Sequence, residues 1–353
     1  MVTIGVVRNF PFRPSPGKEG RNVEFSDFFN TPYLFVGADT NNFPGGLLKI
    51  SRPTFTVQSA FNTPTGQDNP VALCVVGNFL YAGTFDNPAK ILKINIQTFT
   101  TTTVLTLNSG EHYVTSLVAP GDGFLYAGLV GNPGQIAKVN LSTFTEVGSA
   151  LTLNVGEGPV ISLATASGFL YAGLNSGSGA LIAKVNLSTF TEVGSALKII
   201  EGIQNAGSLV APGDGFLYTC LPDLSPAPGI IAKVNLSTFT EVSPALTLGA
   251  GENTPVKMFA IGGFLYVALN GTTPAEIAEV NLTTFTEVVS PLTLGAGENT
   301  LGGLVAPGDG FLYVSLDQSP GLIAKVNLTT FKEVSPPLNT GVGYEEPIGL
   351  AFN

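Results

Sequence analysis

Short apolar runs alternate with clusters of Gly, Pro, Asn and Ser along most of the chain. Nowhere do apolar residues recur with the 3.6-residue period of an amphipathic helix. The run GFLYAGL at 123–129 is typical, and similar runs recur at intervals of 45 to 48 residues. This period predicts one structural unit per copy. The tyrosine of the run marks seven copies: Tyr33, Tyr81, Tyr126, Tyr171, Tyr218, Tyr266 and Tyr313.

Each unit holds four β-like runs joined by turn residues. The first two runs, such as PVISLATA at 159–166 and the GFLYAGL type, are almost wholly apolar, as in strands covered on both faces. The third and fourth alternate more, as outer strands do. Seven units of four strands predict an all-β, seven-bladed β-propeller with four antiparallel strands per blade, its first run innermost.

The two ends of the chain predict how the ring closes. The C-terminal EEPIGLAFN resembles a first run, whereas the first full unit begins at a second run, PYLFVGA. We therefore expect the C-terminal strand to complete the first blade, which removes an open sheet edge. Residues 31–353 would form the propeller and residues 1–30 an N-terminal arm outside the repeat.

The outer hairpin, KVNLSTFTEV at 138–147 and its copies, resembles that of seven-bladed propellers of the YVTN and NHL type. The resemblance covers residues 31–353. It implies the fold, but leaves function open, because these families include lyases, sugar-processing enzymes, quinoproteins, surface-layer components and scaffolds.

Composition narrows the possible partners. Charged residues are only 11% of the chain and the net charge is −10, so the sequence lacks the Lys and Arg clusters that nucleic acids require. No apolar run approaches the ~18 residues of a membrane helix, and we expect no membrane insertion. The N-terminus lacks a cleavage motif, so no secretory signal is predicted.

Few residues suggest catalysis. His112 is the only histidine, and neither a Gly-x-Ser-x-Gly nor an HExxH motif occurs, which argues against a serine triad and a zinc site. An acidic residue does follow the fourth run of every unit, and seven carboxylates around one mouth of the channel would form a ring suited to Ca²⁺. The alternative is that each caps its own turn. The ring would comprise Asp68, Glu111, Glu157, Glu201, Glu252, Glu298 and Glu346.

The loops between the second and third runs differ from unit to unit, whereas the turns on the opposite face are nearly constant. Variable loops on a rigid scaffold are typical of binding sites, although drift in unconstrained loops would look the same. The ligand- or partner-binding residues predicted on this face are Asp39, Asp86, Asp223, Asp317 and His112.

The spacing of the outer hairpin also predicts exposed ion pairs, Lys138 with Glu146 and Lys184 with Glu192, and a like-charge pair of Glu279 with Glu287. The arm offers a basic contact. Its cations are expected to tether the chain to a protein partner or a second copy, or to pack on the chain's own acidic blades. They are Arg8, Arg13, Lys18 and Arg21.

These observations favour a stable, non-enzymatic structural or interaction protein, as a capsid decoration or tail-associated component of a virion or on an extracellular surface. A lectin-like propeller that binds glycans is the alternative, and a propeller lyase or glycosidase comes third. No cofactor is predicted apart from the possible Ca²⁺.

Overall fold

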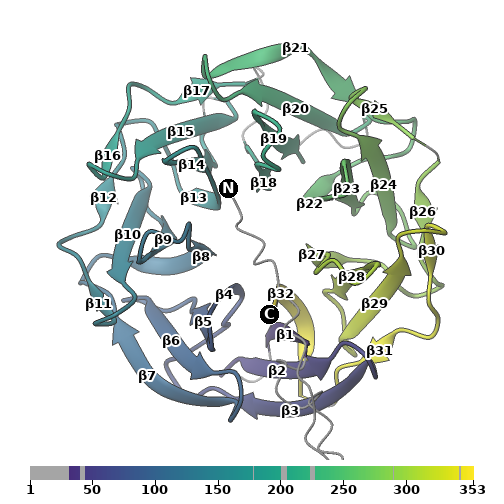
Figure 1. The fold of residues 1–353 in the computed structure, drawn as a ribbon, viewed down its shortest axis with the longest axis horizontal. Coiled ribbons are helices and arrows are strands. Elements are labelled where there is room, and N and C mark those ends of the chain that lie inside the picture. The colour runs from purple at the N-terminus through teal and green to yellow at the C-terminus, as the bar shows by residue number, and fades with distance from the viewer. Residues whose placement is uncertain are drawn as a thin grey trace, which may run out of the picture. The chain divides into compact units, whose positions relative to one another are not determined.

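The computed structural model describes residues 32–39, 44–177, 179–199, 205–222, 227–288, 290–341 and 343–353. All belong to one compact unit, Pro32–Asn353. Seven antiparallel sheets stand around a central channel (Figure 1), and no helix occurs among the described residues. Consequently, no helix in this part of the chain is long and apolar enough to cross a membrane. The predicted seven-bladed propeller is confirmed.

Blades 1 to 4 run from the innermost strand outward. Blade 1 contains β32 (Glu345–Phe352), β1 (Tyr33–Asp39), β2 (Gly46–Ser51) and β3 (Thr56–Asn62). Blade 2 contains β4 (Ala72–Val76), β5 (Phe79–Gly83), β6 (Lys90–Asn95) and β7 (Thr100–Thr106). Blade 3 contains β8 (His112–Val118), β9 (Phe124–Val130), β10 (Gln135–Asn140), β11 (Thr145–Glu146) and β12 (Leu151–Thr152). Blade 4 contains β13 (Val160–Ala166), β14 (Phe169–Leu174), β15 (Leu181–Asn186), β16 (Thr191–Glu192) and β17 (Leu197–Lys198).

Blades 5 to 7 repeat the order. Blade 5 contains β18 (Leu209–Val210), β19 (Phe216–Leu221), β20 (Ile230–Asn235) and β21 (Thr240–Thr247). Blade 6 contains β22 (Pro255–Ile261), β23 (Phe264–Leu269), β24 (Glu276–Asn281), β25 (Thr286–Glu287) and β26 (Leu292–Thr293). Blade 7 contains β27 (Leu301–Val305), β28 (Phe311–Leu316), β29 (Leu322–Asn327), β30 (Lys332–Glu333) and β31 (Leu338–Asn339).

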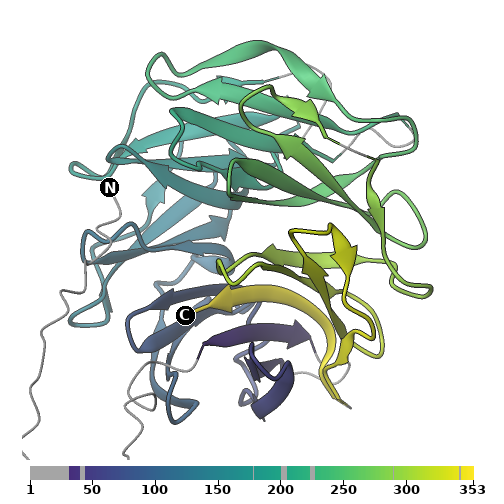
Figure 2. The same ribbon diagram turned by 45° about the vertical axis from the view of Figure 1, so that its right-hand side comes forward.

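The ring closes as predicted, with β32 pairing antiparallel to β1 as the innermost strand of blade 1 (Figure 2). Two polar contacts fix the same joint: the Asn353 side chain accepts a hydrogen bond from Tyr33 N at 2.7 Å, and Arg52 Nη2 donates to Asn353 O at 2.8 Å. Arg52 also forms an ion pair with Asp309 of blade 7 at 3.0 Å. Hydrogen bonds thus join the first and last strands of the propeller directly.

The hydrophobic core lies between successive blades. The second strand of each blade is buried on both faces, as its apolar run predicts, and its side chains pack against those of the neighbouring blade. Between blades 3 and 4, for example, Tyr126 and Ile136 pack with Leu163 and Leu170. Each blade therefore contributes to two interfaces, so no blade has a complete core alone.

The turns between the third and fourth strands add a second contact between blades. In blade 3, the Asn140 side chain accepts hydrogen bonds from the Ser142 and Thr143 amides, which closes the turn and leaves Phe144 at φ +53°. The Phe144 ring then lies 5.7 Å from that of Tyr81 in blade 2. The turn itself therefore accounts for Asn at this point of the repeat.

The predicted hairpin ion pairs are wrong. Glu146 lies opposite Val139, so Lys138 and Glu146 are on opposite faces of the blade. Lys138 Nζ instead lies 4.0 Å from the Phe124 ring centre and 5.3 Å from that of Phe190 in blade 4. Lys184 lies in the same way between Phe169 and Phe239. These lysines join blades through cation–π contacts.

Candidate ligand site in the central channel

One position of the innermost strands forms a ring of side chains around the channel. Three serines and one lysine occupy it on consecutive blades, and small residues occupy it on the other three. The ring is therefore polar on one side and open on the other. Its members are Ser116, Ser162, Ser208, Lys257, Gly303, Gly349 and Ala72.

β-Bulges direct several of these residues. The pairing of the first and second strands shifts register immediately before Ser116, Ser162, Lys257 and Gly303. A bulge adds a residue to one strand and re-aims the side chains that follow it. The bulges therefore determine which residues of an almost wholly apolar strand line the channel.

Two adjoining cavities lie in this part of the channel. One of about 280 Å³ is lined by the innermost strands of all seven blades, and another of about 370 Å³ by blades 3 to 6. Ser116, Ser208 and Lys257 line both. Together the cavities have the size of a site for a small organic molecule.

The serines join neighbouring blades while lining the channel. Ser116 Oγ accepts a hydrogen bond from Leu163 N at 3.1 Å, and Ser208 Oγ accepts one from Met258 N at 3.2 Å. Ser162 Oγ donates to the Gly207 carbonyl. Because Ser116 and Ser208 act as acceptors in these bonds, their hydroxyl protons remain able to donate to a ligand.

Glycine occupies the other side of the ring because neighbouring strands approach closely there. A Cβ on Gly303 would lie 2.6 Å from the Ile348 carbonyl oxygen, and one on Gly349 would lie 2.2 Å from that of Val71. Any larger residue at Gly303 or Gly349 would force the strands apart, so this side of the ring carries only the methyl group of Ala72.

Lys257 is the one charged residue among the described residues that line these cavities. Within the part of the chain that the structure describes, its side chain has no hydrogen-bond or ion-pair partner. Burial lowers the pKa of Lys257, with a smaller opposing effect from Cys220. A lysine held in this way can neutralise an anion, and a larger share of it is neutral amine than in water.

Among the residues that the structure describes, no Asp, Glu or His lines either cavity. The channel therefore offers an ammonium group and hydroxyl donors without a competing carboxylate. This combination suits the oxygens of a phosphate or carboxylate.

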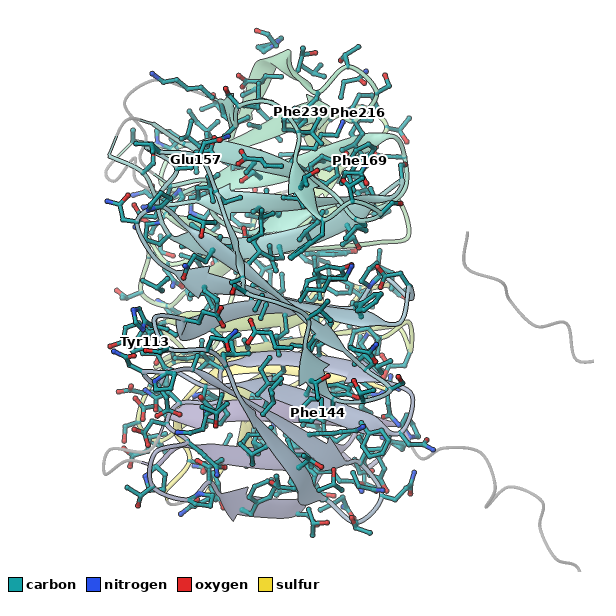
Figure 3. All side chains as sticks on the ribbon, turned by 90° about the vertical axis from the view of Figure 1, so that its left-hand side faces the viewer. Tyr113, Phe144, Glu157, Phe169, Phe216 and Phe239 are labelled. Carbon is teal, nitrogen blue, oxygen red and sulfur yellow. The ribbon has the colours of Figure 1, made fainter. Side chains whose placement is uncertain are left out.

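The residues predicted from the variable loops lie apart from this ring, on the loop face of the propeller. His112 Nδ1 lies 2.8 Å from Asn87 Oδ1, and Asp86 lies 3.6 Å from Lys90 Nζ. Asp39 accepts a hydrogen bond from Asn69, and burial, then the charge of Asp39, raises the pKa of Asp317. Figure 3 shows Tyr113, next to His112, on this face, and Phe144 and Phe216 toward the other.

Four members of the predicted acidic ring do not face the channel axis. Glu111 accepts a hydrogen bond from Ala150 N at 2.9 Å, and Glu157 one from Ala196 N at 2.9 Å, both in the outer part of the next blade. Glu252 and Glu298 lie near Glu287 and Glu333, the equivalent outer-strand residues of blades 6 and 7. Among the described residues, no three His, Cys, Asp or Glu side chains form a group able to hold a metal ion.

Asp68 and Glu346, the remaining described members of the ring, lie in the loop before β4 and near the start of β32. Burial, then the charge of Asp86, raises the pKa of Asp68, and burial, then the charge of Asp317, raises that of Glu346. The other predicted residues lie outside the described ranges: Glu201, Asp223, Arg8, Arg13, Lys18 and Arg21.

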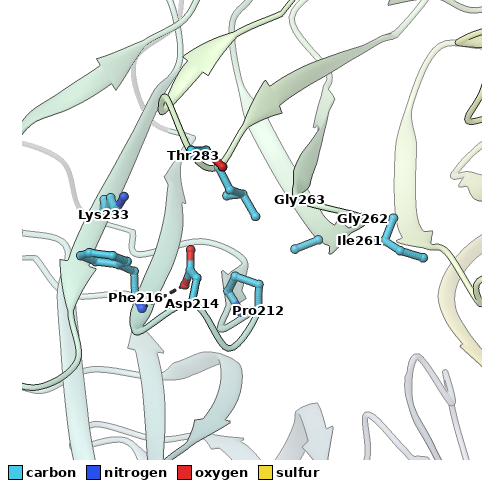
Figure 4. Close-up of a pocket in the computed structure, with 10 residues that line it drawn as sticks. Pro212, Asp214, Phe216, Lys233, Ile261, Gly262, Gly263 and Thr283 are labelled. Atoms are coloured by element: carbon cyan, nitrogen blue, oxygen red, sulfur yellow. Dashed lines mark hydrogen bonds between the residues drawn. The ribbon is translucent and has the colours of Figure 1, made fainter. Parts of the chain in front are cut away.

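A further hollow of about 410 Å³ lies between blades 5 and 6 on the turn face (Figure 4). Its polar groups already have partners. Asp214 accepts hydrogen bonds from Phe216 N and the Tyr218 hydroxyl, and Lys233 Nζ lies 3.9 Å from the centre of the Phe216 ring. The channel is therefore the better candidate site.

Sequence reasoning missed Lys257, although a signal was present. The first run of unit six, PVKMFAI, is the one such run with a lysine in its middle, and Lys257 lies 49 residues after Ser208 and 46 before Gly303. An alignment of the first runs of the seven units, rather than of their loops, would have shown that Lys257 occupies the position of Ser208 and Gly303.

Comparison with known proteins supports the fold. No protein-family model matches the chain, and no curated protein matches it in sequence. Among solved structures, a candidate 6-phosphogluconolactonase from Bacteroides uniformis is 14% identical, with a TM-score of 0.69, 92% of this chain and 100% of that chain covered. A second, from Bacteroides fragilis, is 13% identical, with a TM-score of 0.68 and 92% and 98% covered. Hydrazine synthase from Kuenenia stuttgartiensis is 13% identical, with a TM-score of 0.62 and 84% and 90% covered.

These likenesses correct the function predicted from the sequence. The three propellers named above bear the names of enzymes, and neither the structure nor the comparisons support a non-enzymatic virion or surface component or a lectin. The prediction relied on low charge and on the absence of catalytic motifs in the loops, whereas the channel carries a half-buried lysine. At identities this low, the likeness establishes the fold and assigns no reaction.

Proposed function

We propose that the protein binds a small organic anion in its central channel, with Lys257 as the main contact and the Ser116 and Ser208 hydroxyls as neighbouring donors. The observation that carries the proposal is the lining of the channel, which among the described residues presents one ammonium and several hydroxyls and no carboxylate. In a partly desolvated site, a half-buried ammonium attracts an anion more strongly than it would in water.

A phosphorylated sugar acid is the ligand we favour. The cavity volumes suit a molecule of this size, and two similar propellers are named after a phosphorylated sugar lactone. Its phosphate would contact Lys257, and its hydroxyl groups the rest of the ring. The resemblance to YVTN- and NHL-type propellers remains a prediction, and it is compatible with such a ligand.

Hydrolysis of the corresponding lactone is a second candidate function, favoured by the lowered pKa of Lys257. In this reaction the lactone carbonyl, and not the phosphate, would lie at Lys257, whose neutral amine would take a proton from the attacking water. The ring C–O bond then breaks, and the ammonium returns its proton to the departing alkoxide, so the lysine is regenerated.

The test is calorimetric titration of the full chain with 6-phosphogluconate, alongside Lys257→Met and the exposed-site control Lys332→Met. We expect the wild type and the control to bind alike and Lys257→Met to bind at least tenfold more weakly, about 1.4 kcal/mol. Equal binding by Lys257→Met, or no binding by the wild type, would contradict the proposal. A lactonase assay on the same three proteins tests hydrolysis separately.

A further inference from the structure

Among the residues that the structure describes, four pairs of glutamates lie at the junctions between blades, away from the channel. In each pair, one glutamate follows the outer strand of a blade and the other belongs to the outer strand of the next blade. The pattern repeats along the chain, so it is a regular part of the architecture. The pairs are Glu111 with Glu146, Glu157 with Glu192, Glu252 with Glu287, and Glu298 with Glu333.

In the first pair, Glu111 is 4% exposed and accepts N–H groups on both oxygens: Asn108 N at 3.0 Å on Oε2 and Ala150 N at 2.9 Å on Oε1. Glu146 Oε2 accepts from Asn108 Nδ2 at 2.8 Å, but Glu146 Oε1 is buried with no donor. N–H donors stabilise an ionised carboxylate, so Glu111 is the anion of the pair. An ionised Glu146 would leave a buried oxygen without a partner, which is costly.

The other pairs repeat this defect. Glu192 Oε1, Glu287 Oε1 and Glu333 Oε1 are buried without partners. Glu298, 4% exposed, also has its Oε2 unpartnered. Five buried carboxylate oxygens, distributed over the four pairs, therefore lack a hydrogen-bond donor.

We infer that each of these four pairs binds one proton at neutral pH, as a carboxyl group that donates to the neighbouring carboxylate across the blade junction. A shared proton supplies the missing donor and removes the repulsion between two buried like charges. The inference is independent of the channel site and of any ligand there.

The surroundings favour a proton over a metal ion. No Lys or Arg among the described residues forms an ion pair with any of the eight glutamates. His112 follows Glu111 but contacts Asn87, and Glu276 is a further acidic group near Glu252. Two carboxylates fall short of the six to eight oxygens that Ca²⁺ takes.

One glutamate of each pair also has a raised pKa. Burial, then the hydrogen bond and charge of the partner, raises the pKa of Glu146 and of Glu192 to about 8. Burial and then the partner raise the pKa of Glu252 and of Glu298 to about 7. Since these pKa values lie above the ordinary value of 4.5 of the unfolded chain, the stabilisation is complete below that pH and is lost progressively as the pH rises to 7 and 8.

The test is thermal unfolding of the full chain between pH 6 and pH 9, with a chelator present. We expect the midpoint of the wild type to fall over this range, also in high salt, which screens the general repulsion of a chain with net charge −10. In Glu146→Gln/Glu192→Gln, the amide donates without titrating, so the fall should be less than half as large, because these two pairs have the higher pKa values. The fall of the unfolding midpoint with pH should vanish when Glu252→Gln and Glu298→Gln are added to these two substitutions.

A second measurement does not depend on the variants folding equally well. The infrared carbonyl band of protonated carboxyl groups should be present in the wild type at pH 6.5 and absent at pH 9. A midpoint independent of pH, or an equal fall in the fourfold variant, would overturn the inference. So would a midpoint at pH 9 that Ca²⁺ restores in the wild type alone, because metal ions would then occupy the pairs.

Discussion

At the residue scale, Glu279 shows how one unit compensates for a missing partner. The other six blades carry lysine at this point of the third strand. Blades 3, 5 and 7 also carry an aspartate in the turn between the first and second strands. That aspartate accepts the hydroxyl of the buried tyrosine, as Asp122 does from Tyr126 at 2.8 Å. Blade 6 lacks the aspartate, and Glu279 accepts the Tyr266 hydroxyl at 2.9 Å instead.

We therefore predict that Glu279→Ala destabilises the protein by about 1–3 kcal/mol, because the buried Tyr266 hydroxyl would lose its acceptor. Glu279→Gln keeps an acceptor oxygen and should cost less. Denaturant unfolding of both variants and the wild type measures the difference. Equal stability of Glu279→Ala and the wild type would refute this role.

The same residue shows a limit of prediction from spacing. The eight-residue interval predicts that Glu279 lies opposite Glu287, and Lys138 opposite Glu146. The register instead pairs Glu287 with Val280 and Glu146 with Val139, which turns each predicted pair to opposite faces. A shift of one residue cannot be predicted from spacing alone, since it depends on how the turn closes.

At the scale of elements, the repeat period predicted the four-stranded blades and the closing role of β32. Both follow from apolar runs and turn residues, which are local in the sequence. The ring of channel residues could not be predicted in this way. Register shifts before Ser162 and Lys257 determine which side chains face the channel, and a bulge has no signature in these runs.

Deletion of the last eight residues, 346–353, should remove most of β32 and expose an edge of β1. It also removes Asn353, the partner of Tyr33 and Arg52. We expect a loss above ~4 kcal/mol, beyond the range of most single substitutions. Arg52→Met, which removes one contact of the same joint, should cost less.

Thermal unfolding monitored by circular dichroism compares these two proteins with the wild type. A truncated chain that unfolds at the wild-type midpoint would show that the closing strand is dispensable.

At the scale of the whole molecule, the propeller has two regions of different character. The junctions between blades hold lysines stacked on aromatic rings and paired carboxyl groups, and they serve the ring itself. The channel holds Lys257 without a protein partner among the described residues. Under the proposed function, low overall charge is a poor guide, because one partly desolvated charge in the channel interacts more strongly with an anion than exposed charges do.

The channel lysine also predicts how binding depends on pH. Only the ammonium form attracts an anion, so above the second pKa of the phosphate, about 6, affinity should first hold and then fall as the pH rises through the lowered pKa of Lys257. An exposed lysine would hold its charge to about pH 10.4. Calorimetry with 6-phosphogluconate over this range should show the loss of affinity at a lower pH.

The measurement that tests the central claim most directly is NMR of the ¹³C-methylated lysines of the full chain, with the Lys257 resonance assigned by its absence in Lys257→Met. We predict that this resonance titrates below the other lysines, and that 6-phosphogluconate shifts it and raises its pKa, because a bound anion stabilises the ammonium. A Lys257 resonance that titrates like an exposed lysine and does not respond to the anion would contradict the account.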